Sequence, residues 1–359
     1  MKKTLAILLA LIVLSLSTVS VAAATDGING ANWLSALDDS LPITAINMPG
    51  THDSAARYVN FSSLARTQSL SIPQQLCSGV RYFDMRLNVK GKKIVAYHSV
   101  IPCKKSIGLF AADITANDIV SDCKSFLEQN PGETVLFLLR QEGLTRDKEF
   151  FGRFYDDIIA PSPELWFTEN RIPNLGEVRG KIVLLRSCEL DASRFETANS
   201  GINFEDYPYI SSTDTDNFRF KAIEEADGEI VGYMYVQDSY KVEGEKKTKT
   251  IASFFDDNLS ENHFNICCTN ANNLKNPYAN AKHINAFLSS YDFKAGSVYG
   301  IVSMDFATPE LCERIYMTNL PLMTSAPNAA NITEYGESYG FLGELMLKIR
   351  DFFLRLTLI

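Results

Sequence analysis

The sequence predicts an α/β fold with one domain, in which short apolar strands alternate with helices. Two segments, 134–139 and 181–185, are almost entirely apolar, which is typical of strands buried on both faces of a parallel sheet covered by helices. The order of strand, loop and helix recurs with no break in composition, which favours one domain. Polar residues repeatedly follow these strands, where a (β/α) barrel or a doubly wound sheet places its active site. No Gly-x-Gly-x-x-Gly pattern follows a strand, so we expect no dinucleotide site.

The individual elements can be placed in order along the chain. The first strand is expected at 43–48, because a mostly apolar run ends there at the turn-forming pair Pro49-Gly50. Apolar or alternating runs predict later strands at 80–87, 94–98, 134–139, 181–185, 230–237, 263–268 and 297–304. Helices are expected at 71–78, 116–129, 279–289 and about 309–316, the last with Thr308 as its N-cap. The lysine-rich segment 241–250 is expected to be a solvated loop.

Composition limits the possible partners. The 359 residues carry a net charge of −9 and are 46% hydrophobic, which is an ordinary globular composition with ample material for one barrel-sized domain. An acidic chain is a poor candidate for binding nucleic acid, because neutralising a phosphate backbone requires clustered lysine and arginine. Such a chain can still hold a single phosphate group in a local arginine pocket.

The two ends of the chain differ from the middle. Met1-Lys2-Lys3, an apolar run over 4–21 and the small residues at 21–24 predict a secretory signal peptide over 1–24, with an uncleaved anchor as the alternative. We therefore expect a secreted, extracellular protein with its folded domain at 25–330. In the extension 331–359, four charged residues form a narrow polar stripe on an otherwise apolar helix at 341–359. That helix either packs on its own domain or on a second copy, or lies on a membrane surface.

The seven cysteines do not predict a metal site. Export permits disulfides, but an odd number leaves at least one thiol unpaired within the chain. Their spacings match no zinc template, so most are expected to be buried small hydrophobic residues, with one or two bridges possible. The cysteines are Cys77, Cys103, Cys123, Cys188, Cys267, Cys268 and Cys312.

Two of the four histidines point to acid–base chemistry. His52 and His98 both follow apolar strands, so both side chains should reach the same end of a barrel. Two histidines with nearby carboxylates and an arginine suit cleavage of a phosphodiester, in which one histidine accepts a proton and the other donates one. His263 and His283 lie at the start of a run and inside a helix, and are expected to be structural.

Three motifs carry a resemblance to a known family. Met-Pro-Gly-Thr-His-Asp-Ser at 48–54, Arg-Tyr-Phe-Asp-Met-Arg-Leu at 81–87 and Ile-Val-Ala-Tyr-His at 94–98 occur in this order and at this spacing. They resemble the X-domain motifs of phosphatidylinositol-specific phospholipase C, in particular the small secreted bacterial type. Further matches stand at 181–186, 236–240 and 301–306, so the resemblance runs from about Leu41 to about Asn319. It implies a somewhat irregular TIM barrel that cleaves phosphatidylinositol to diacylglycerol and inositol 1,2-cyclic phosphate at a membrane or micelle surface.

The resemblance also implies a role for each matching residue. His52 is expected to be the general base for the inositol 2-hydroxyl, with Asp305 holding its tautomer. His98, assisted by Asp53, is expected to be the general acid for the diacylglycerol oxygen. Arg86 is expected to stabilise the pentacovalent phosphorus. The expected substrate-binding residues are Asp84, which positions Arg86 or His98, Arg140, which stands where relatives have lysine, and Arg186, Asp238 and Tyr240.

The same motifs predict that the enzyme needs no cofactor. Calcium-dependent relatives have an Asn beside the first histidine and an acidic residue at the position of Arg86, whereas this chain has Asp53 and an arginine. Arginine has no acceptor with which to ligate Ca²⁺, and its fixed charge can take the place of the metal. We therefore expect a metal-independent enzyme.

Two other functions compete with this interpretation. One is another barrel phosphodiesterase, acting on glycerophosphodiesters or sphingomyelin, although such enzymes usually hold a divalent metal with several carboxylates. The other is a catalytically silent X-domain that serves as a lipid-binding module. The oligomeric state, the disulfide pairing and activity on glycan-linked anchors stay open at this point.

Overall fold

The computed structural model describes residues 27–60, 62–107, 110–144, 146–205, 207, 218–271 and 276–328. The expected signal peptide and the expected helix at 341–359 lie outside the described residues. Within this part of the chain, no helix is long and apolar enough to cross a membrane.

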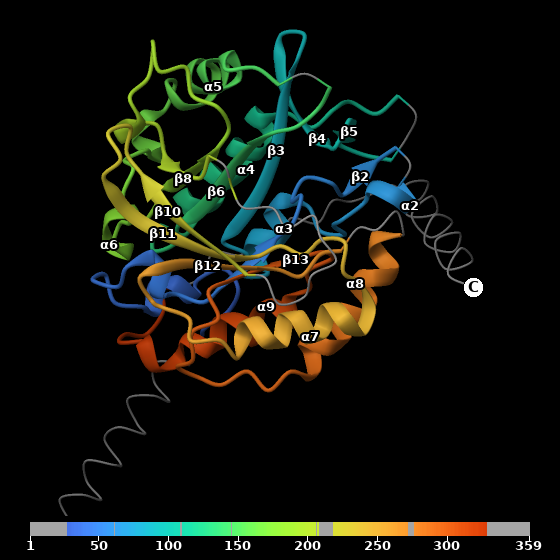
Figure 1. Cartoon of the computed structure of the whole chain (residues 1–359), viewed down its shortest axis with the longest axis vertical. Helices are drawn as coiled ribbons and strands as arrows, with labels where there is room; N and C mark the ends of the chain where they lie inside the picture. Colours follow the sequence, from blue (N-terminus) through green and yellow to red (C-terminus); the bar gives the residue numbers. More distant parts are fainter. Residues whose placement is uncertain are drawn as a thin grey trace, which may run out of the picture.

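One thirteen-stranded sheet forms the wall of an incomplete barrel (Figure 1). Its parallel strands lie in the order β11-β12-β13-β1-β3-β6-β8. These strands are β1 (Met48–Thr51), β3 (Tyr82–Lys90), β6 (Val135–Gln141), β8 (Ile182–Ser187), β11 (Ile230–Gln237), β12 (His263–Cys268) and β13 (Ile301–Met304). Parallel pairing brings the carboxyl ends of all seven to one end of the barrel, which is the end expected to carry the site.

Shorter strands extend the wall and account for its irregularity. The antiparallel strands are β2 (Tyr58–Val59), β4 (Lys93–His98), β5 (Ile101–Lys104) and β10 (Arg219–Glu224), and the two-residue strands β7 (Trp166–Phe167) and β9 (Ile202–Asn203) pair with β8. Among the described residues, no strand pairing joins β9 to β10. Instead, the side-chain amides of Asn203 and Asn170 donate to the backbone carbonyl of Glu224 at 3.0 and 3.2 Å. Side chains therefore bridge the gap that backbone pairing leaves.

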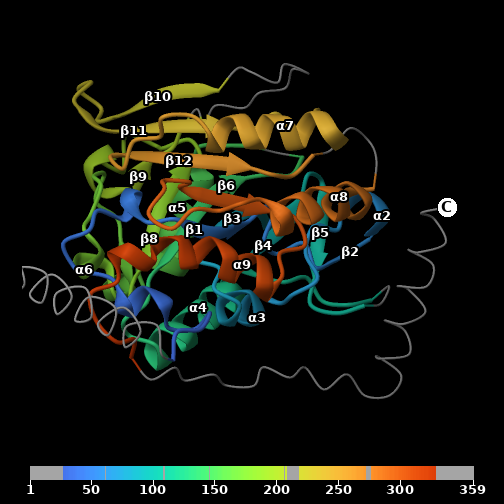
Figure 2. The same cartoon turned by 90° about the horizontal axis from the view of Figure 1, so that it is seen from below.

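Helices cover the outer face of the wall. Helices α7, α8 and α9 lie next to one another along the β11–β13 side, as Figures 1 and 2 show from two directions. The α-helices are α2 (Ser62–Ala65), α3 (Ile72–Cys77), α4 (Ala116–Gln129), α5 (Glu149–Phe154), α6 (Leu175–Val178), α7 (Gly244–Phe255), α8 (Pro277–Ser290) and α9 (Pro309–Tyr316). The predictions for α4 and α9 are confirmed at both ends, because their starts are fixed by local caps at Thr115 and Thr308.

The first strand begins later than predicted. Residues Ile43–Ala45 form a 3₁₀ turn, and Pro49-Gly50 lies inside β1 instead of ending it. Pro49 is tolerated because its carbonyl still accepts a hydrogen bond from the backbone N–H of Arg81, at 2.9 Å. Gly50 is required by close packing, since a Cβ at this position would lie 2.8 Å from the Tyr82 ring. The shift places His52 one residue beyond the end of β1.

Residues 244–250 of the expected solvated loop at 241–250 instead form the first part of helix α7. Its Lys247 is fully buried, and the ammonium group donates to Gln237 Oε1 at 3.0 Å and to the Ser239 carbonyl at 3.2 Å. The sequence prediction was wrong because the sequence alone does not show whether a lysine is buried. The groups that accept hydrogen bonds from Lys247 belong to Gln237 and Ser239, which lie outside helix α7. The seven cysteines are all free, and all but Cys77 are buried.

Candidate active site

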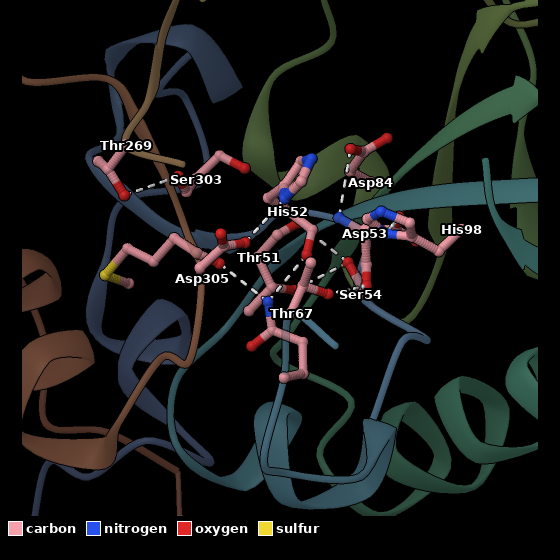
Figure 3. Close-up of polar contacts among 12 residues, drawn as sticks. Thr51, His52, Asp53, Ser54, Thr67, Asp84, His98, Thr269, Ser303 and Asp305 are labelled. Carbon is pink, nitrogen blue, oxygen red and sulfur yellow. Dashed lines mark hydrogen bonds and ion pairs between the residues drawn. The ribbon is translucent and has the colours of Figure 1, made fainter. Parts of the chain in front are cut away.

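Four strands deliver the predicted catalytic residues to one cavity. His52 follows β1, His98 ends β4 and Asp305 follows β13 (Figure 3). Arg86 lies on β3. A cavity of about 450 Å³ opens beside His52, Arg86 and His98. It is lined by His52, Arg86, His98, Ser99, Glu142, Arg146, Asp238, Tyr240 and Asn270.

His52 is paired with Asp305. The imidazole Nδ1 lies 2.7 Å from Asp305 Oδ1, and both side chains are buried. The backbone fixes this contact, because the His52 N–H donates to the Met304 carbonyl and the Gln68 amide donates to the carbonyls of both His52 and Met304. Burial, assisted by the positive charge of Arg86, lowers the pKa of His52 well below its ordinary value of 6.5. Its imidazole is therefore neutral near pH 7 and can accept a proton.

His98 is paired with Asp53, at 2.5 Å between Nδ1 and Oδ2. Asp53 and Ser99 have φ angles of 44° and 55°, in the left-handed region that few non-glycine residues adopt. The turn at Asp53 separates its carboxylate from the adjacent His52. Burial acts against the charged imidazolium of His98, but the Asp53 carboxylate outweighs that effect and raises the pKa of His98 above 6.5. The two histidines thus differ in protonation although each contacts an aspartate.

The Arg86 guanidinium is surrounded by carboxylates. Its Nε and Nη2 donate to Asp84 Oδ2 at 3.0 and 2.9 Å, and its Nη1 donates to Glu142 Oε1 at 2.9 Å. Asp53 Oδ2 lies 3.7 Å from Nη1. Burial alone would raise the pKa of Asp84, but Arg86 and Arg140 together lower it far below its ordinary value. Arg86 is consequently a fixed cation, held in one orientation beside His98.

Glu142 was missed by the sequence interpretation. Its Oε1 accepts from Arg86, and its Oε2 accepts the backbone N–H of Ser99 at 2.6 Å. One carboxylate therefore ties the arginine to the residue that follows His98. The signal in the sequence is its place just after the apolar run of β6, the same kind of position that singled out Arg140.

Arg140 and Asp238 also face the interior of the barrel. Arg86 and Arg140 are direct partners in the β3–β6 pairing, so their side chains lie on the same face. Arg140 Nη1 lies 3.5 Å from Asp84 Oδ1, and its guanidinium stacks over the Tyr207 ring at 4.9 Å. Asp238 is 5% exposed and, with Tyr240, lines the far side of the cavity. Burial raises the pKa of Asp238, an effect that Arg140 opposes.

Arg186 is not brought to the cavity, which corrects its expected place. In the β6–β8 pairing, Arg140 is opposite Ser187, whereas Arg186 is opposite Leu139 and points to the outer face. Its guanidinium lies 6.0 Å from the Phe151 ring of α5 and donates to the Cys188 carbonyl at 2.6 Å. Successive side chains of a strand point to opposite faces. A difference of one position therefore decides whether an arginine faces the cavity or packs in the core outside the barrel.

The donors around the cavity do not form a metal cage. Within the described part of the chain, no three or more His, Cys, Asp or Glu side chains are grouped as metal ligands. Three of the carboxylates near the histidines, those of Asp53, Asp84 and Glu142, face the Arg86 guanidinium, whereas that of Asp305 contacts His52.

Comparisons with known proteins show partial sequence similarity to two bacterial enzymes of one name. No protein-family model matches the chain. It is 33% identical over 163 residues to 1-phosphatidylinositol phosphodiesterase of Listeria monocytogenes, over 43% of this chain and 47% of the relative. The protein of the same name from Staphylococcus aureus strain Newman is 30% identical over 163 residues, 43% of this chain and 49% of that relative. The matches thus span about half the length of these curated relatives.

The solved structures extend the likeness over most of the barrel. A mutant of phosphatidylinositol-specific phospholipase C from Staphylococcus aureus superposes with a TM-score of 0.63 at 22% identity, over 83% of this chain and 98% of that one. The Listeria monocytogenes enzyme superposes with a TM-score of 0.59 at 23% identity, over 81% and 99%. The predicted TIM-type barrel is confirmed. The chain therefore has the fold of bacterial phosphatidylinositol-specific phospholipase C, and over about half their length it is similar in sequence to bacterial 1-phosphatidylinositol phosphodiesterases.

Proposed function

We propose that the chain is a phosphatidylinositol-specific phospholipase C that forms diacylglycerol and inositol 1,2-cyclic phosphate by acid–base catalysis. One observation carries this proposal: two buried His–Asp pairs with opposite pKa shifts flank one cavity, with a fixed guanidinium beside them. The likeness to proteins named phosphatidylinositol phosphodiesterases supports the choice of substrate.

The first half of the proposed step belongs to His52. Asp305 accepts the Nδ1–H, which leaves Nε2 free to take the proton from the inositol 2-hydroxyl. The lowered pKa of His52 keeps this nitrogen unprotonated near neutral pH. The 2-oxygen then forms a bond to phosphorus within the same molecule, so the attack needs no water.

The second half belongs to His98. As the bond between phosphorus and the diacylglycerol oxygen breaks, the imidazolium gives its proton to that oxygen. The Asp53 carboxylate raises the pKa of His98 and so keeps the proton available near pH 7. The proton taken by His52 and the proton given by His98 balance, and the ring product carries the cyclic phosphate.

Arg86 is proposed to stabilise the negative charge on the phosphate oxygens without a metal ion. Asp84 and Glu142 hold the guanidinium in place on two sides, so little reorganisation is needed when charge develops. A guanidinium offers several N–H donors in one plane, which suits two phosphate oxygens at once.

The inositol ring is proposed to be held by Arg140, Asp238 and Tyr240. Asp238 lines the cavity and accepts hydrogen bonds from hydroxyl groups, whereas Tyr240 offers a ring face. Asp84 serves this part of the site indirectly, because it contacts both Arg86 and Arg140. Arg186 is omitted, since it lies on the outer face of β8.

The proposed setting is an extracellular enzyme acting at a lipid surface. We propose 25–330 as the catalytic domain, with the leader 1–24 directing export, and we propose that the extension 331–359 supplies a membrane-binding helix. Support comes from the charge and apolar pattern of the sequence at both ends. In addition, a solved Staphylococcus aureus phosphatidylinositol-specific phospholipase C binds membranes, and this binding can be modulated.

³¹P NMR of phosphatidylinositol vesicles incubated with the protein and EDTA tests the proposal. We expect a cyclic phosphodiester resonance to appear, whereas phosphatidylcholine, sphingomyelin and glycerophosphocholine should give no product. Activity that requires calcium would contradict metal independence. Turnover of a choline substrate would favour another phosphodiesterase, and vesicle binding without turnover would identify a silent lipid-binding module.

A further inference from the structure

The proposed substrate cavity is lined by a buried asparagine whose side-chain oxygen has no hydrogen-bond partner among the described residues. Asn270 is 4% exposed and lies with His52, Asp238 and Tyr240 around the same space. Its Oδ1 accepts no hydrogen bond from any residue that the structure describes. None of the catalytic or binding roles proposed above uses this side chain.

The backbone next to Asn270 is well fixed. The N–H and the hydroxyl of Thr269 both donate to the Ser303 carbonyl, at 2.9 and 3.1 Å, which extends the β12–β13 contact beyond the strand (Figure 3). Asn270 is the next residue, on the side of the barrel that carries Asp305. The amide is therefore presented to the cavity from a rigid position, which is how binding groups are usually held.

An unsatisfied buried amide destabilises a folded protein, and native structures contain few of them. For such a group that lines a cavity, a bound ligand can supply the missing partner. Oδ1 is an acceptor, so its partner must be a donor, and a phosphodiester has none. A hydroxyl group both donates and accepts, and so satisfies the amide in either of its two rotations.

We propose that Asn270 is a further substrate-binding residue, which hydrogen-bonds a hydroxyl of the inositol ring on the side of the cavity nearer Asp305. This inference rests on the proposed function and deepens it. Asn270 then contributes to specificity, because a choline or glycerol headgroup does not present a ring hydroxyl at this position. A site built around a hydroxyl rejects an analogue that lacks it, since the amide is left unpaired.

Asn265, on the strand β12 that leads to Asn270, provides a matched control. It is equally buried, at 1% exposure, and its Oδ1 also lacks a partner among the described residues. However, Asn265 does not line the cavity, and its Nδ2 donates to the carbonyls of Ser260 and His263 at 2.7 and 3.2 Å. Asn270 thus faces the cavity, whereas Asn265 faces the protein interior and stabilises the backbone around it.

The test compares Asn270→Ala and Asn265→Ala in binding and stability. Dissociation constants for myo-inositol and a set of monodeoxy-inositols are measured by NMR titration, and unfolding midpoints by denaturant titration. We expect Asn270→Ala to weaken myo-inositol binding by about three- to tenfold, the range of one neutral hydrogen bond. The loss should vanish for the one deoxy compound that lacks the contacted hydroxyl. The midpoint of Asn270→Ala should equal or exceed that of the wild type, whereas Asn265→Ala should unfold earlier and bind inositol normally.

Other results would overturn the inference in recognisable ways. Unchanged myo-inositol binding by Asn270→Ala, or an equal loss for every deoxy compound, contradicts the contact while leaving the proposed function intact. Lower stability of Asn270→Ala with normal binding shows a structural role. If the wild type itself neither binds myo-inositol nor cleaves phosphatidylinositol, both the inference and the proposed function fail.

Discussion

The two His–Asp pairs of the site look alike, but their histidines differ in protonation, with His52 neutral and His98 charged near pH 7. In each pair an imidazole Nδ1 contacts a buried carboxylate, at 2.7 Å for His52 and 2.5 Å for His98. Burial and Arg86 lower the pKa of His52, whereas Asp53 outweighs burial and raises the pKa of His98. The contact alone therefore does not decide the role of a histidine. The surrounding charges do, and pairs of groups pushed apart in pKa mark the acid and the base.

Removing either histidine is expected to have the largest effect on turnover. His52→Ala and His98→Ala should each lower kcat for phosphatidylinositol by roughly 10²–10⁴-fold, the usual contribution of a positioned acid or base. The measurement is steady-state turnover on mixed micelles. His263→Ala is the control, because His263 packs against the Phe220 and Tyr233 rings away from the cavity. Turnover unchanged in His52→Ala would exclude His52 as the base.

Arg86 helps to lower the pKa of His52 and is proposed to bind the phosphate. Arg86→Lys should lower kcat by about 10²–10³-fold, because one ammonium group cannot contact Asp84 and Glu142 and still offer paired donors to the phosphate. Turnover and KM should be measured together. A change confined to KM would mean that Arg86 binds the ground state and contributes nothing further in the transition state.

The pH dependence of kcat/KM separates the two pairs. The base His52 must be neutral, so the acid limb of the profile should lie below pH 6.5, and the acid His98 must be protonated, so the alkaline limb should lie above it. Asp53→Asn removes the carboxylate that raises the pKa of His98. The alkaline limb should then move to lower pH, with about a tenfold loss at pH 7.5. Asp305→Asn should lower the rate without moving that limb. A shift of the alkaline limb in Asp305→Asn would instead indicate that His52 is the acid and His98 the base.

The smallest expected effect on catalysis is that of Arg186. Arg186→Met should leave KM for phosphatidylinositol unchanged, because the side chain lies on the outer face of β8. It should lower the free energy of unfolding by about 1–3 kcal/mol, since the Cys188 carbonyl loses a buried donor. Arg140→Met is the matched comparison and should raise KM, because Arg140 lies one position beyond Leu139, the β6 partner of Arg186, and so faces the interior. A higher KM for Arg186→Met would return this residue to the substrate site.

The sequence was sufficient where structure is decided locally. Helices α4 and α9 were predicted at their true ends, because each begins at a threonine cap and follows a helical period. The residues after the apolar runs were identified as the site because parallel strands bring their carboxyl ends together. The fold class followed from the same pattern.

The remaining features depend on contacts between distant residues. Whether Arg186 faces inward depends on its register with β6, and Lys247 is buried only because Gln237 and Ser239 accept from it. The bridging role of Glu142 requires Ser99 and Arg86 to approach it from two other segments. None of these partners can be read from the local sequence. Asn270 stands out only once its missing partner is seen in the folded chain.

A substrate with a better leaving group tests the central assignment most directly. In an analogue of phosphatidylinositol with sulfur in place of the bridging diacylglycerol oxygen, the departing thiolate needs no proton, because thiols are far more acidic than alcohols. We predict that His98→Ala recovers most of its lost kcat on this analogue, whereas His52→Ala remains as impaired as on phosphatidylinositol. Recovery by His52→Ala instead, or by neither variant, would contradict the assignment of His52 as the base and His98 as the acid.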